Sequence, residues 1–98
     1  MPKVRLKVSD VEQAYTGKME AIKDDSGDHI YYYLEYKGSE YTVGKLSHSW
    51  KGTLNDTQIL MLARKLHLQK REFELWVICD IETPDMIQIW QNRRQSTN

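Results

Sequence analysis

The residues of this chain that are best suited to chemistry lie around the start of a tyrosine-rich segment and just beyond it. His29 follows Asp28, and its imidazole, with an ordinary pKa of about 6.5, can take or give a proton at neutral pH. Lys45 stands just before a polar loop that contains His48 and Lys51. Free backbone N–H groups at a helix start attract anions, so a loop of this kind ahead of a helix is a candidate phosphate site. We therefore predict proton transfer at His29 and anion binding near the loop.

Aromatic and basic side chains could extend such a site. Tyr31 and Tyr33 share the strand parity of His29, and their rings could stack on unpaired bases. The stretch 57–71 holds four basic residues and no acid, which suits a phosphate-binding patch but equally a solvated helix face. The tyrosines are equally consistent with a cover for the terminal helices or with a protein interface. The nucleic-acid contacts predicted from the sequence are Tyr31, Tyr33, Lys45, His48, Lys51, Arg64, Lys65, Lys70 and Arg71.

Metal and cofactor chemistry finds no support in the residue spacing. His29, His48, His67 and Cys79 contain no short ligand pair of the Cys-x-x-Cys or His-x-x-x-His kind. A glycine-rich phosphate loop and a dinucleotide fingerprint are also missing from the sequence. We therefore expect no metal and no cofactor.

Length and composition set the scale of the molecule. The chain has 98 residues, with 14 Lys plus Arg against 14 Asp plus Glu, so a single small domain over 1–94 with a frayed tail at 95–98 is expected. Zero net charge argues against the strongly basic class of nucleic-acid binders. Cys79 is the only cysteine, and the longest apolar run, 59–63, is far shorter than the roughly 20 residues of a membrane span. The expectation is a cytoplasmic protein without a membrane partner.

Three strands are predicted to position the candidate site. In the segment 29–36, aromatic and branched residues dominate, and the even positions from Ile30 to Tyr36 look like a core face, which leaves His29, Tyr31 and Tyr33 on the other face. Turn formers on either side of this segment predict hairpins. The neighbouring strands are expected within 18–23 and over 40–46.

Helices are predicted at both ends of the chain. Ser9 and Glu12 form a capping-box pattern for a short first helix that Gly17 would end. Asn55 to Gln58 is a second such pattern, and the apolar spacing that follows predicts a helix over 56–67. The segment 70–79 suits either a helix or a buried strand, and we favour the helix. Thr83-Pro84 starts a final helix. The predicted fold class is α+β, with a three-stranded antiparallel sheet, helices on one face and extra C-terminal helices.

Several of these motifs together resemble the HicA-type toxins. The similar residues are Gly27-Asp28-His29-Ile30-Tyr31-Tyr32, Tyr36-Lys37-Gly38, Tyr41-Thr42-Val43, the His48 loop, and Gly52-Thr53-Leu54 before the helix. The resemblance covers about residues 9–75. This chain differs in having Asp28 where the family usually has serine, and in continuing through Arg94.

The resemblance implies a fold and a function. Those toxins are small mRNA interferases with a double-stranded-RNA-binding-like α-β-β-β-α core, and His29 matches their catalytic histidine. We therefore expect an RNA-binding HicA-like domain acting as a metal-independent endoribonuclease, with RNA and an antitoxin or other protein as partners. The alternatives are a non-catalytic protein-interaction module and a DNA-binding helix-turn-helix made by 56–67 and 70–79.

Overall fold

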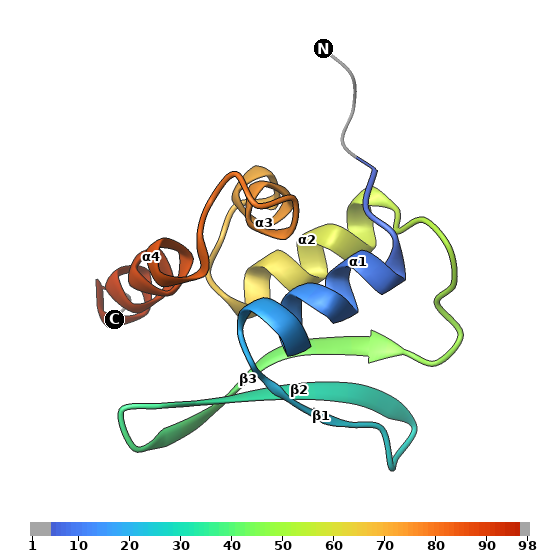
Figure 1. The fold of residues 1–98 in the computed structure, drawn as a ribbon, viewed down its shortest axis with the longest axis horizontal. Coiled ribbons are helices and arrows are strands. Elements are labelled where there is room, and N and C mark those ends of the chain that lie inside the picture. Colours follow the sequence, from blue (N-terminus) through green and yellow to red (C-terminus); the bar gives the residue numbers. More distant parts are fainter. Residues whose placement is uncertain (1–4, 97–98) are drawn as a thin grey trace.

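The computed structural model describes residues 5–96 and shows an α+β fold in which helices lie over one face of an open three-stranded antiparallel sheet (Figure 1). This layering agrees with the predicted fold class. The elements, in chain order, are α1 (Val8–Gln13), a π-helical turn η1 (Ala14–Lys18), β1 (Ile22–Asp24), β2 (His29–Tyr36), β3 (Ser39–Ser47), α2 (Asp56–Lys65), α3 (Lys70–Val77) and α4 (Thr83–Ser96).

The start of α1 differs from the predicted capping box. The carboxylate of Asp10 accepts a hydrogen bond from the backbone N–H of Lys7, 3.0 Å away, so the helix begins two residues earlier than a Ser9 cap would allow. Glu12, the predicted partner of Ser9, instead forms an ion pair with Lys23 of β1 at 3.1 Å. The Ser9–Glu12 capping prediction is therefore wrong.

The end of the first helix also differs from expectation. Gly17 does not stop it, because the chain continues as the π-helical turn η1 through Lys18. The chain then reverses at Glu20, whose φ is +58°. The first strand consequently starts only at Ile22, late in the predicted segment 18–23, and ends at Asp24.

The central strand β2 spans 29–36 as predicted, and β3 extends the predicted 40–46 by one residue at each end. The strand order is β1-β2-β3, with β2 paired to both neighbours. Lys37 and Gly38 connect β2 to β3 with φ values of +50° and +83°. Positive φ at both central residues is the geometry of a type I′ hairpin turn, in which glycine carries no steric penalty.

A β-bulge in β3 decides which of its side chains reach which face of the sheet. Tyr32 pairs with Gly44 but Tyr33 pairs with Thr42, so Val43 is an extra residue in β3. Val43 is fully buried. Beyond the bulge, Lys45 pairs with Tyr31 and therefore lies on the uncovered face.

The α2 helix begins as the sequence predicts. Asn55 accepts a hydrogen bond from the Gln58 backbone N–H at 2.8 Å, and the Gln58 side chain accepts one from the Asn55 N–H at 2.9 Å. These reciprocal bonds satisfy donors that the first helical turn leaves free. The helix ends at Lys65, slightly before the predicted boundary at 67.

The segment 70–79 is helical over 70–77, which confirms the helix and excludes the strand. Phe73 and Trp76 lie on the buried side of α3. The last helix, α4, runs to Ser96, so the backbone of the first two residues of the predicted frayed tail is helical. The remainder of that tail, 97–98, lies outside the described residues.

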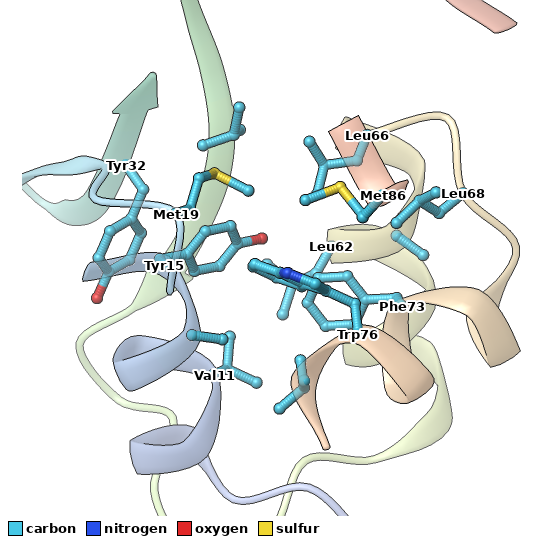
Figure 2. Packing of buried hydrophobic residues seen from close by; sticks show 14 of the residues in the cluster. Val11, Tyr15, Met19, Tyr32, Leu62, Leu66, Leu68, Phe73, Trp76 and Met86 are labelled. Atoms are coloured by element: carbon cyan, nitrogen blue, oxygen red, sulfur yellow. The ribbon is translucent and has the colours of Figure 1, made fainter. Parts of the chain in front are cut away.

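Aromatic rings form the centre of the core, between the helices and the sheet (Figure 2). The Tyr15 ring stacks on Tyr32 with centroids 4.7 Å apart and meets the edge of Trp76 at 5.6 Å. Gly44 lies directly beneath it, since a Cβ there would be 2.5 Å from the Tyr15 ring. Glycine is therefore required for β3 to pass this ring.

Candidate functional site

The open face of the sheet is organised in cross-strand rows, because residues paired between antiparallel strands point to the same side. His29 pairs with Ser47, and Tyr31 pairs with Lys45. The sheet thus brings together a candidate base and a cation that are 16 positions apart in the sequence.

These side chains surround a hollow of about 280 Å³. Its lining residues are His29, Lys45, Ser47, Trp50 and Met61. His29 and Lys45 come from β2 and β3, Trp50 from the loop after β3, and Met61 from α2. An imidazole, an ammonium and a hydroxyl therefore converge on one opening with two apolar walls.

An aromatic row runs away from this hollow along β2. The rings of Tyr31 and Tyr33 are stacked, with centroids 6.2 Å apart and planes 19° from parallel, and the His29 ring approaches Tyr31 edge-on at 6.3 Å. The Lys45 ammonium lies 5.8 Å from the centre of the Tyr31 ring. A cation within about 6 Å of a ring centre is in the range of an attractive cation–π contact. All three aromatic rings are partly exposed, as the predicted parity requires.

The His48 side chain does not line the hollow. Its Nε2 lies 3.1 Å from the backbone carbonyl oxygen of Gly27, so in the tautomer with a proton on Nε2 it donates a hydrogen bond to the loop before β2. This contact links the loop after β3 to the loop before β2. Lys51 is exposed in the same loop. Of the predicted anion-binding residues Lys45, His48 and Lys51, only Lys45 lines the hollow with His29.

The predicted basic stretch divides into bound and available cations. The Lys70 ammonium lies 3.4 Å from the Asp56 carboxylate and 3.3 Å from the Glu74 carboxylate. The ion pair with Asp56 joins the start of α3 to the start of α2. Although partial burial lowers the pKa of Lys70, the hydrogen bonds and negative charges of Glu74 and Asp56 leave that pKa above its usual value. This lysine therefore stabilises the helix layer.

The other three cations of the stretch are exposed, and within residues 5–96 they form no ion pair: Arg64, Lys65 and Arg71. Arg64 and Lys65 stand three and four positions after Met61 on α2. That spacing makes them neighbours on a helix surface. A polyanion in the hollow could therefore continue over the edge of β3 towards these two cations.

Acidic residues lie at two other places on the open face. Asp24 of β1 pairs with Tyr31 from the side opposite Lys45, and Glu35 pairs with Glu40 at the hairpin end. Hydrogen bonds from the Ser26 hydroxyl and N–H lower the pKa of Asp24, which keeps it ionised. Phosphate is therefore favoured only on the β3 side of the His29 end.

Comparison of the chain with protein-family models, with curated proteins and with solved structures finds no match.

Two apolar members of the hollow were not identified from the sequence. Trp50 and Met61 carry no charge and belong to no catalytic pattern, so only the folded arrangement reveals them. A tryptophan within an otherwise polar loop was the one available signal for Trp50.

In the part of the chain that the structure covers, no three His, Cys, Asp or Glu side chains are placed to hold a metal ion. Over the same residues, every helix is too short or too polar to cross a bilayer.

Proposed function

We propose that this protein is a HicA-like RNA-binding domain that cleaves single-stranded RNA without a metal ion, with His29 as the catalytic residue. The observation that carries the proposal is the convergence of His29 and Lys45 on one hollow beside a stacked tyrosine row. A general base and a cation suit phosphodiester transfer without a metal ion, and an aromatic platform suits the stacking of an unpaired base.

The chemical step is an internal transfer of the phosphodiester. His29 accepts the proton of a ribose 2′-hydroxyl, whose oxygen attacks the adjacent phosphorus while the bond to the 5′-oxygen breaks. The products are a 2′,3′-cyclic phosphate and a 5′-hydroxyl, which takes its proton from water or from the protonated His29. The ammonium of Lys45 offsets the negative charge that builds up on the phosphate oxygens.

The distribution of charge on the molecule favours one path for the RNA. Asp24 on the β1 side and the two glutamates at the hairpin end repel phosphate, whereas Lys45, Arg64 and Lys65 attract it. The backbone would therefore enter across β3, with a base on Tyr31. Lys51, which is exposed in the neighbouring loop, would add a phosphate contact.

The order of the elements supports the HicA resemblance. An α-β-β-β-α order, with helices on one face of an antiparallel sheet, is what that resemblance implies, and α3 and α4 would then be additions to it. The proposed partners of this protein are RNA and an antitoxin-like protein. The cytoplasm is the proposed compartment, because a lone cysteine provides no intramolecular disulfide.

The helix-turn-helix alternative has weaker support. Four of the eight residues of α3, including Phe73 and Trp76, are buried, and Lys70 is held by two carboxylates. Little polar surface remains on this helix for reading bases in a major groove.

Incubation of the purified protein with labelled single-stranded RNA in chelator tests the proposal. His29→Ala should lower the cleavage rate by about 100-fold or more, the usual contribution of a general base, while RNA binding stays within a few-fold. Lys45→Ala should weaken both cleavage and binding. His67→Asn is the matched control, because His67 is exposed on the helix layer with φ +55°, a conformation that asparagine tolerates.

The outcomes separate catalysis from binding. Equal cleavage by His29→Ala and the unmodified protein would refute the catalytic role. Salt-sensitive RNA binding without any cleavage would leave an RNA-binding protein and remove the enzyme. Absence of RNA binding at low salt would refute the whole proposal.

A further inference from the structure

The hairpin end of the open sheet face has a different character from the His29 end. Ile22, Tyr33 and Thr42 form one cross-strand row there, and Glu35 and Glu40 form the next. Ile22 is 61% exposed, more than any other large hydrophobic side chain in residues 5–96. We call these five residues the acidic end of the open face.

The two glutamates of the acidic end are unfavourably placed in the isolated chain. They are paired directly across β2 and β3, both are exposed, and among the described residues neither forms an ion pair. Like charges directly opposite each other on a sheet are destabilising. A cationic group bound between them would relieve this repulsion.

The lysine closest to Glu35 in the sequence does not supply that charge. Lys37 follows Glu35 by two residues in the hairpin turn, and its ammonium lies 5.4 Å from the centre of the Tyr36 ring. Tyr36 packs against Trp90 on the covered side of the sheet. The Lys37 ammonium therefore lies by the Tyr36 ring, on the covered face of the sheet, and not between the two glutamates of the open face.

The Tyr33 ring of the acidic end lies among negatively charged side chains. Desolvation raises the pKa of Tyr33, and repulsion from Asp24, from Tyr31 once it is ionised, and from Glu40 raises it further. A ring with an apolar neighbour on one side and carboxylates around it is suited to a planar cation that both stacks and donates hydrogen bonds.

We propose that the acidic end of the open face binds an arginine-bearing, partly apolar segment of another protein. The guanidinium would stack on Tyr33 and donate hydrogen bonds to Glu35 and Glu40, while an aliphatic side chain of the partner would cover Ile22. Arginine suits this place better than lysine, because its planar fork combines stacking with several donors. The two carboxylates repel phosphates, so a nucleic acid is disfavoured here and the candidate RNA path ends at Tyr31.

This inference does not rest on the proposed ribonuclease function. The acidic end uses none of the residues that line the hollow, and peptide binding can be measured without RNA. Failure of either proposal leaves the other standing. Because Tyr33 also stacks on Tyr31, a bound partner would contact the ring row next to the candidate RNA path.

The test titrates the full chain, isotope-labelled for NMR, with a short synthetic peptide of alternating arginine and leucine. A peptide with glutamate in place of every arginine is the matched ligand control. The expected result is saturable binding of the arginine peptide alone, with the largest shifts at Ile22, Tyr33 and Thr42. No saturable binding up to about 1 mM peptide would overturn the proposal.

Paired variants test whether the site is specific. Glu35→Gln with Glu40→Gln should weaken peptide binding by about tenfold or more and at the same time raise the melting temperature, because the repulsion between the strands is removed. Asp80→Asn with Glu82→Gln removes the same charge from an exposed loop far along the chain and should leave binding unchanged. Equal weakening by both pairs, or shifts centred around residues 80–82, would show non-specific charge attraction and overturn the proposal.

Discussion

Three consecutive tyrosines in β2 lie in two contrasting environments. Tyr32 is fully buried and stacks on Tyr15 beneath the helices, whereas Tyr31 and Tyr33 stack on each other at the open face. The pleat of the strand sends neighbouring side chains to opposite faces, so identical residues acquire different roles. On this strand, a residue that stabilises the core is therefore directly followed and preceded by residues of the candidate site.

The largest expected effect is on the buried side. Tyr32→Ala should lower the free energy of unfolding by about 4 kcal/mol, because it removes a fully buried ring from a packed core. Tyr33→Ala, on the partly exposed side, should cause a much smaller loss. Chemical denaturation of both variants measures the difference, and equal losses would show that the two faces do not differ in this way.

The second-largest expected effect is a loss of stability at Gly44, whose missing side chain leaves room for the Tyr15 ring. Gly44→Ala should destabilise the protein by about 3 kcal/mol, since its Cβ would lie 2.5 Å from a ring with no room to move. Gly27→Ala is the control, because a Cβ there meets nothing within 4 Å. Thermal unfolding should show a large drop in melting temperature for the first variant only. A small change for Gly44→Ala would mean that the Tyr15 ring can shift.

The smallest effect is the response of the buried pair to alkaline pH. Burial raises the pKa of Tyr15 strongly, with a further rise from Tyr32, whose own pKa burial also raises. A raised folded pKa contributes stability that is complete below the unfolded value of about 10 and decreases as the pH rises above it. One pH unit above that value, Tyr15 should cost about 1.4 kcal/mol of stability.

Absorbance of ionised tyrosine and circular dichroism, followed together during a pH titration, check this response. The buried pair should ionise only as the fold is lost, so that part of the absorbance change coincides with the dichroism change. Tyr15→Phe should move this transition to higher pH. Ionisation of every tyrosine before any unfolding would contradict the burial of the pair.

Local sequence signals predicted most of the fold. Alternation within 29–36 gave the bounds of β2 and its two faces, the Asn55–Gln58 pattern gave the start of α2, and 70–77 is the predicted helix. These features depend on contacts between residues close in sequence. The start of α1 was predicted wrongly, because Asp10 formed the cap, and β1 lies later than most of its predicted segment, because a π-helical turn replaced the stop expected at Gly17.

The candidate site was only partly predictable. Alternation alone would place Lys45 on the same side of its strand as Val43, in the core. The bulge at Val43 reverses that parity and turns Lys45 towards Tyr31. The pairing of Lys70 with Asp56 and the engagement of His48 with Gly27 likewise depend on segments that meet only after folding.

The sequence by itself determined the α+β class, the central strand and the residues that its two faces display. These follow from periodicity, turn chemistry and capping, which act over a few residues. Only the tertiary structure decided which cations surround His29, which are held in ion pairs, and where the acidic end of the open face lies. Those outcomes depend on strand register, and one extra residue in β3 changes which side chains share a face.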